Sequence, residues 1–190
     1  MNADALSDAI LAAVCIYIAV RYGRELPGLA LAVGLIALAA IVGVARFSGW
    51  DNFLGPHRFT SLLAACAAFP LLALLLRWPE APSATRLTAA GRFALIVGGV
   101  GVAATTLGMT LWGMVLPGAS AVLITWTMLQ RRKWSGLAGA AALLAGFGVA
   151  AMGQAADNYL GVFNNIQFLH YSLAVALLLL ANSTRHKVLS

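Results

Sequence analysis

Charged residues are scarce in this chain: Asp, Glu, Lys and Arg make up 9% of its 190 residues, whereas 62% are hydrophobic. A soluble domain carries roughly a quarter charged residues, so this chain has too few to cover a water-facing surface. Apolar runs of about 20 residues recur along the whole length, and runs of this length cross the hydrocarbon core of a bilayer. The composition predicts an all-α integral membrane protein with a single membrane domain, residues 1–190, and no soluble domain.

Several chemistries are excluded by residues that the sequence lacks. The last predicted span, 163–182, contains no lysine that could form a Schiff base with retinal. His57 and His170 are expected at different depths, unlike the two axial ligands of a haem. The P-loop, the H-E-x-x-H helix and paired C-x-x-C motifs are also missing from the sequence. Nothing in the sequence other than its net charge of +6 points to nucleic acid, so we expect no nucleic-acid partner.

Hydropathy predicts seven spans. The boundary between the fourth and fifth is the weakest, because segment 109–120 has no charge and offers only Trp112, Pro117 and Gly118 to make a turn. Fusing those two spans would leave six. The seven predicted spans are 5–22, 27–47, 57–77, 91–110, 113–130, 134–153 and 163–182.

The distribution of positive charge favours seven spans over six. With seven, ten of the twelve Lys and Arg residues fall on one side, and only Arg46 and Arg58 fall on the other. Cytoplasmic loops are enriched in Lys and Arg, so the N-terminus is predicted outside and the C-terminus in the cytoplasm. The first 20 residues lack a basic segment and carry Asp4 and Asp8, which predicts a first span rather than a cleaved signal. We expect the inner membrane of a bacterium.

A polar pentapeptide occurs twice, as DNFLG at 51–55 and DNYLG at 157–161, and each copy follows the second helix of a predicted triplet. When the sequence is shifted by 106 residues, so that the two pentapeptides coincide, the basic loops also align. The pattern predicts a 3+1+3 parallel repeat in which a fourth helix restores the orientation. The alternative is convergence of Ala/Leu-rich helices. The predicted parts are 1–77 for the first repeat, 78–111 for the loop and linker helix, and 112–190 for the second repeat.

Polar residues gather at the non-cytoplasmic end of the predicted bundle. Asp4 and Asp8 are four residues apart on one face of the first helix, and the last helix carries a polar stripe that ends at His170, well inside its span. We predict a ligand pocket there, although the aspartates of the pentapeptides are equally suited to capping helices. His57, at a helix start, is expected to be solvated. The predicted site comprises Asp4, Asp8, Asp51, Asn52, Asp157, Asn158, Asn164, Gln167 and His170.

The last predicted span, NIQFLHYSLAVALLL, and the segment 51–55 resemble the seven-span superfamily of alkaline ceramidases and progestin/adipoQ receptors, called CREST. The resemblance implies zinc, with Asp51 in the family's aspartate role and His170 as the second histidine of its H-x-x-x-H motif. Ile166 replaces the first of those histidines, and the second span lacks the family's serine and histidine. A catalytic zinc ion takes three protein ligands, so we expect no metal and no other cofactor.

Three classes of function remain open. The first is a protein that binds a lipid or a small polar ligand in an outward-facing pocket, as a sensor or partner subunit. The second is a lipid-processing hydrolase of CREST type, and no complete catalytic set can be written for it. The third is a small-solute transporter, because sugar transporters of the SWEET type share the repeat plan. The expected partners are membrane lipids, and the Gly/Ala-rich helix faces suit a homo- or hetero-oligomer.

Overall fold

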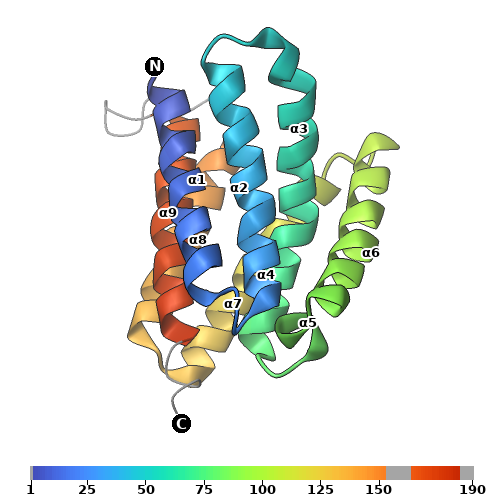
Figure 1. The fold of residues 1–190 in the computed structure, drawn as a ribbon. Helices are drawn as coiled ribbons and strands as arrows, with labels where there is room; N and C mark the ends of the chain where they lie inside the picture. Colours follow the sequence, from blue (N-terminus) through green and yellow to red (C-terminus); the bar gives the residue numbers. More distant parts are fainter. Residues whose placement is uncertain (1, 153–163, 185–190) are drawn as a thin grey trace.

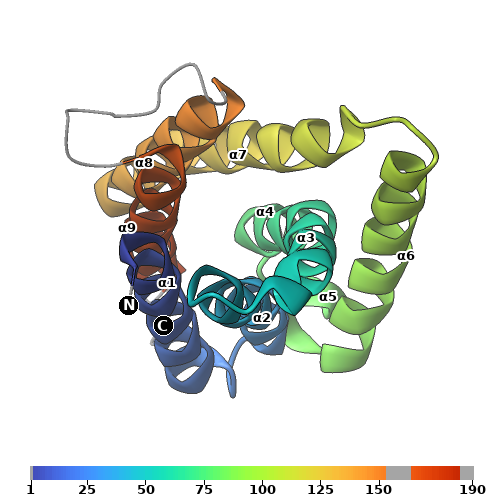
Figure 2. The ribbon, with the colours of Figure 1, turned by 90° about the horizontal axis from the view of Figure 1, so that it is seen from above.

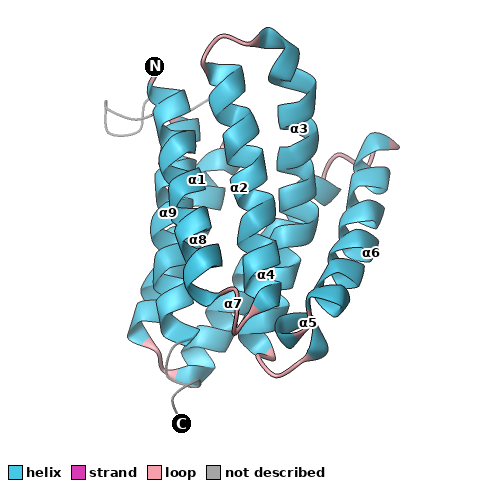
Figure 3. Ribbon diagram, in the orientation of Figure 1, coloured by secondary structure: helices cyan, strands magenta, loops and turns pink. Residues whose placement is uncertain are grey.

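The computed structural model describes residues 2–152 and 164–184, which contain helices and no strands (Figure 3). Seven of these helical segments are long and apolar enough to cross a membrane, which confirms the predicted count. The spans are α1 (Ala3–Tyr22), α2 (Pro27–Phe47), the composite third span (Asp51–Arg77), α6 (Leu87–Thr106), α7 (Trp112–Arg131), α8 (Trp134–Ala151) and α9 (Asn165–Thr184).

The largest differences from the predicted span limits lie in the third and fourth spans, and the fourth runs over 87–106 rather than 91–110. The third span begins at Asp51 rather than at residue 57, because the segment 51–55 itself coils into the helix start. The turn between the fourth and fifth spans lies at 107–111 and contains Gly108, whose φ of 98° favours glycine. Pro117 and Gly118, expected to form this turn, lie inside α7 instead.

The third span changes its helical geometry along its length. It begins with the 3-10 turn η1 (Asp51–Phe53), continues as α3 (Leu54–Leu63), widens into the π-helix η2 (Ala64–Ala68) and ends as α4 (Phe69–Arg77). Pro70 has no backbone N–H to offer the carbonyl of Cys66, and its ring crowds that turn. The wider turn directly before the proline relieves this conflict, and such π-turns occur frequently at functional sites.

The helices pack around a core of small and aliphatic residues (Figure 1). α1 lies between α2 and α9, α8 packs on α9, and α4 packs on α7. Seen from above, α6 lies on the far side of α3 and α4 from α1 and α9 (Figure 2). Its Gly98 and Gly101 approach Ala67 and Cys66 of the π-helix so closely that a Cβ on either glycine would collide with them. Because lipid tails are as apolar as leucine, such close packing, rather than burial from water, holds these helices together.

α1 begins and α9 ends at opposite ends of the bundle, and the start of α1 lies at the top of Figure 1, called the upper end below. Of the ten described Lys and Arg residues, only Arg46 and Arg58 belong to the upper end. At the lower end, Arg131 donates a hydrogen bond of 3.0 Å to the carbonyl of Arg77, the last residue of α4. A cation there satisfies a carbonyl that the end of the helix leaves unpaired.

The outer surface of the bundle is apolar. Val20, Leu95 and Leu107 are 79%, 76% and 84% exposed, and many other aliphatic side chains are exposed on the spans. A protein surrounded by water rarely exposes contiguous apolar surface of this extent. Together with the lengths of the seven helices, this surface indicates a multi-pass membrane protein.

Candidate functional site

α1 and α9 begin side by side at the upper end, and each start carries a side-chain cap. Asn2 Oδ1 accepts a 2.6 Å hydrogen bond from the N–H of Asp4. Asn164 Oδ1 accepts a 2.8 Å bond from the N–H of Gln167, and the Gln167 amide oxygen accepts the N–H of Asn164 at 3.4 Å. This reciprocal pair is a capping box, which fixes the start of α9 and the direction of its first turn.

Asp4 joins the two helices. Its Oδ1 accepts hydrogen bonds of 2.7 Å from both Asn164 Nδ2 and Gln167 Nε2. Hydrogen bonds to an ionised acceptor are stronger than those between neutral groups, so this contact ties the capping box of α9 to the first turn of α1. The Asp4 carboxylate is therefore satisfied within the seam between the two helices.

His170 lies deeper in the same seam. It is the sixth residue of α9 and Asp8 is the sixth residue of α1, so both lie roughly 7.5 Å along their helices from the first residue. His170 Nδ1 is 3.0 Å from Ser7 Oγ and 3.4 Å from Asp8 Oδ1. The side chains of His170 and Asp8 are 12% and 1% exposed. Burial of ionisable side chains inside a membrane span is costly, and such residues generally mark functional sites.

The hydrogen bonds of Ser7 determine which proton the imidazole carries. The Ser7 hydroxyl donates its only hydrogen to the carbonyl of Asp4, at 2.8 Å. We therefore assign Nδ1–H of the ring as the donor in the 3.0 Å contact with Ser7 Oγ. His170 is then a neutral imidazole whose Nε2 has a free lone pair, and no described residue hydrogen-bonds this atom.

The Asp8 carboxylate fits into a notch on α2 that exists because residue 43 is glycine. A Cβ on Gly43 would collide with the carboxylate. Asp8 Oδ2 is buried and has no hydrogen-bond partner among the described residues. A buried polar atom without a partner costs about 1–3 kcal/mol. The Asp8 oxygen is therefore a strong candidate for contact with a ligand.

A cavity of about 590 Å³ lies beside Asp8 and His170. Its volume lies within the range of roughly 300–1,000 Å³ that is typical of small-molecule sites. Every span except α6 contributes to its wall. Four polar side chains line it, Asp8, His57, Ser61 and His170.

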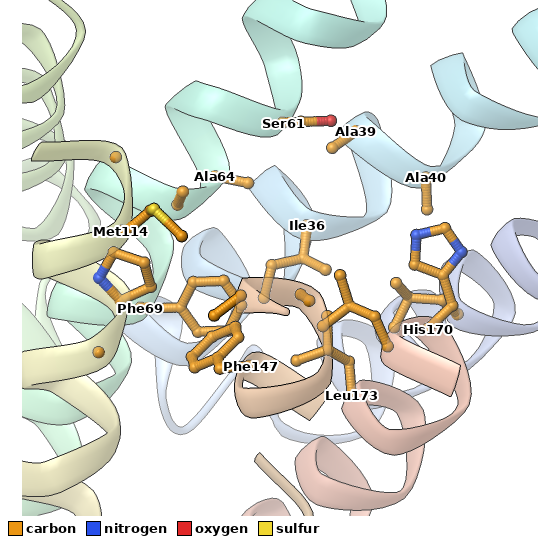
Figure 4. Close-up of a pocket in the computed structure, with 18 of the residues that line it drawn as sticks. Ile36, Ala39, Ala40, Ser61, Ala64, Phe69, Met114, Phe147, His170 and Leu173 are labelled. Atoms are coloured by element: carbon orange, nitrogen blue, oxygen red, sulfur yellow. The ribbon is translucent and has the colours of Figure 1, made fainter. Parts of the chain in front are cut away.

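The rest of the wall is apolar. Phe69 of α4 and Phe147 of α8 meet edge to face at 4.8 Å between ring centroids. In Figure 4, His170 lies at one end of the row of labelled side chains, Phe69, Phe147 and Met114 lie at the other, and Ile36 and Leu173 lie between them. The cavity therefore combines a polar corner with a longer apolar part.

The exposed residues of the cavity wall all belong to α7 and α8. Met114 and Leu144 line it and are 54% and 39% exposed, and the lining residue Gly148 is also exposed. These residues belong to membrane-spanning helices whose outer surfaces are apolar.

The predicted site residues fall into groups. Asp8 and His170 line the cavity, and Asp4, Asn164 and Gln167 form the adjoining seam. Asp51 and Asn52 are exposed in η1 and do not line the cavity. No side-chain cap is formed at the start of η1 or α3, so Asp51 does not cap this helix. The remaining two predicted residues, Asp157 and Asn158, lie outside the described residues.

Four residues of the site were missed by sequence reasoning, and one of them, His57, was expected to be solvated but lines the cavity with its Nδ1 buried. Ser7 orients the imidazole, Gly43 makes room for the carboxylate, and Ser61 lines the cavity. Ser7 and Asp8 are adjacent polar residues within an otherwise apolar run, and that pairing was a usable signal. Gly43 resembles many other glycines in the chain, and only the position of Asp8 distinguishes it.

The proximity of Ser7, His170 and Asp8 does not create a catalytic triad. In a triad the serine and the aspartate contact opposite nitrogens of the imidazole, so that one nitrogen receives the serine proton. Here both contact Nδ1. Ser7 is also fully buried, at 0% exposure.

The described residues also do not fit a zinc ion. Within residues 2–152 and 164–184, no three His, Cys, Asp or Glu side chains form a group that could hold a metal. Of Asp51 and His170, the two positions that the CREST resemblance assigns to its site, only His170 lines the cavity.

Comparisons with protein-family models, with curated proteins and with solved structures found no match. The resemblance to the CREST superfamily therefore stays a prediction that rests on its motif residues.

Proposed function

We propose that this protein binds an amphipathic molecule, a lipid or a small ligand with a polar head, in the cavity beside Asp8 and His170. The observation that carries the proposal is the pairing of a long apolar wall with a buried polar corner in which Asp8 Oδ2 has no partner among the described residues. A polar head in that corner would supply the missing hydrogen bond, and a hydrocarbon chain would fill the apolar part. A binding site without a catalytic set suits a sensor or the partner subunit of a larger complex.

The test fills the cavity with a side chain. Gly148 of α8 lines the cavity, and a Cβ there would meet no atom within 4 Å. We expect the purified wild-type protein in detergent to bind at least one of dodecanol, dodecylamine and dodecanoate saturably, at about one equivalent by native mass spectrometry. Gly148→Phe should remove this binding, because the new ring would occupy the space of the hydrocarbon chain.

Gly99 of α6 provides a matched control. It is exposed, does not line the cavity, and a Cβ there would also meet no atom within 4 Å. Gly99→Phe makes the same chemical change on a span outside the cavity and should leave binding unchanged. Equal binding by both variants, or no saturable binding of any of the three probes by the wild-type protein, would refute the proposal.

We also propose that the upper end faces the outside of a bacterial inner membrane. The support is the concentration of Lys and Arg at the lower end, because cytoplasmic loops are enriched in these residues. Ser48→Cys, at the upper end, should react with a membrane-impermeant maleimide in intact cells, and Ser135→Cys, at the start of α8, should react only after lysis. Labelling of Ser135→Cys in intact cells would reverse the orientation.

A further inference from the structure

We infer that the polar corner of the cavity selects a ligand whose head group donates hydrogen bonds and carries positive charge, such as a primary amine on a single hydrocarbon chain. This inference rests on the proposed function and adds the chemistry of the head group. The corner presents hydrogen-bond acceptors that no described residue satisfies.

The first acceptor is the carboxylate of Asp8. Its Oδ2 is buried without a hydrogen-bond partner among the described residues, and its Oδ1 is 3.4 Å from His170 Nδ1. A charge-assisted bond between a cationic nitrogen and a carboxylate is typically about 2.7–2.9 Å long. The longer distance fits a neutral imidazole that donates mainly to Ser7, at 3.0 Å. His170 therefore does not neutralise the Asp8 carboxylate, and Arg46 interacts with this carboxylate electrostatically without forming an ion pair.

The second acceptor is His170 Nε2. Because Nδ1 carries the proton, Nε2 presents a lone pair on the opposite edge of the ring, and His170 lines the cavity (Figure 4). An ammonium group has three donors and no acceptor. An ammonium group can donate to either acceptor, whereas a carboxylate head would face two acceptors.

Among the described residues, no Lys or Arg side chain forms an ion pair with Asp8. The cavity wall contains no Lys or Arg side chain among its residues. Arg46, on the same helix as Gly43, stacks against the ring of Phe47 with its guanidinium carbon 4.7 Å from the centroid, and no described ion pair joins it to Asp8. A buried carboxylate needs a partner of opposite charge or strong donors, and the ligand is the available source.

The apolar part of the cavity indicates that the ligand also carries a hydrocarbon chain. Ile36, Leu173 and the Phe69–Phe147 pair follow His170 along the wall (Figure 4). A hydrocarbon chain attached to the amine would lie along these side chains, and a small hydrophilic amine without a chain would leave them unfilled. The inferred class is thus a long-chain amine rather than a soluble polyamine.

The experiment compares three head groups on one chain length. Dissociation constants of dodecylamine, dodecanol and dodecanoate are measured for the full-length protein in a neutral detergent by competition native mass spectrometry. Dodecylamine should bind about tenfold or more tightly than dodecanoate, because a hydrogen bond to a charged group contributes about 1.5–3 kcal/mol and 1.4 kcal/mol is a factor of ten. The affinity for dodecanol should lie between those for dodecylamine and dodecanoate.

Two substitutions assign the preference to Asp8. Asp8→Asn keeps the shape of the side chain and removes its charge. It should raise the dissociation constant of dodecylamine by about tenfold and change that of dodecanol by about threefold or less. Asp51→Asn removes the same charge from an exposed site at the same end of the bundle, and should leave the order of the three probes unchanged.

The outcomes separate the two proposals. Dodecanoate binding as tightly as dodecylamine, in a manner that Gly148→Phe abolishes, would overturn the head-group inference and leave the cavity as a binding site. Binding that Gly148→Phe leaves intact would overturn both. If Asp8→Asn does not fold, the order of the three probes on the wild-type protein still decides the inference.

Discussion

The two histidines of the spans line the same cavity but are held in different ways. His170 of α9 donates to Ser7 and approaches Asp8, both on α1. His57 of α3 has a buried Nδ1 without a hydrogen-bond partner among the described residues, and its ring meets Phe47 edge to face at 5.7 Å. The imidazole of His170 is oriented by side chains of another helix, whereas that of His57 is held by ring packing and by a hydrogen bond to the backbone of Ala39 on α2.

The difference shows what fixes a polar side chain inside a membrane bundle. His170 lies at the junction of two helices whose starts are capped and tied together by Asp4. α3 has no side-chain cap, and the next segment of its span is a π-helix. An oriented imidazole with one defined free lone pair can select a head group. His57, whose ring contacts Phe47 and the backbone of Ala39, contributes shape and volume more than selectivity.

The largest expected effect comes from replacing each histidine in turn. His170→Phe preserves bulk but removes Nε2 and leaves Ser7 and Asp8 without their partner, so it should abolish measurable binding of the dodecylamine probe. His57→Phe should change the affinity by about threefold or less, because the polar contact of His57 is with the backbone of Ala39 rather than with Asp8 or His170. Native mass spectrometry on both variants provides the measurement. Equal losses would show that the two histidines have equivalent roles.

A smaller effect is expected from breaking the seam that holds His170. Asp4→Ala leaves the side-chain amides of Asn164 and Gln167 without their shared acceptor. It should lower the free energy of unfolding by about 1–3 kcal/mol, measured by chemical denaturation in detergent. Asp51→Ala, an exposed change near the start of the His57 helix, should have an effect close to zero. A similar loss for both would mean that Asp4 is no more than a surface charge.

The spans and their order followed from the sequence because each depends on local composition. Runs of apolar residues gave the seven helices, and the register of Asn164, Gln167 and His170 placed three polar groups on one face of α9. The expectation that the first helix can neighbour the last is confirmed by the packing of α1 on α9. The predicted repeat and the orientation in the membrane stay predictions.

The partners of these residues were harder to predict, because they depend on how each helix is rotated against its neighbours. Asp4 and Asp8 share a face of α1, yet one is bound by α9 and the other is buried against Gly43 of α2. The capping box of Asn164 and Gln167 was visible as an Asn followed three residues later by Gln, and it was interpreted only as a polar stripe. Asp51 belongs to a conspicuous repeated motif but is exposed, because it lies in the first turn of its span.

The smallest expected effect tests how His170 is oriented. Ser7 is fully buried, and its Oγ is the closer of the two acceptors for His170 Nδ1, at 3.0 Å against 3.4 Å for Asp8 Oδ1. Ser7→Ala removes the closer acceptor, so Nδ1–H turns to Asp8 and competes with the ligand for the carboxylate. A neutral hydrogen bond contributes about 0.5–1.5 kcal/mol, so dodecylamine should bind about two- to tenfold more weakly, whereas dodecanol should change less. The ratio of the two dissociation constants distinguishes this reorientation from a general loss of packing, which would weaken both probes equally. The same variant should leave the small effect of His57→Phe unchanged, because α3 shares no hydrogen bond with Ser7 among the described residues.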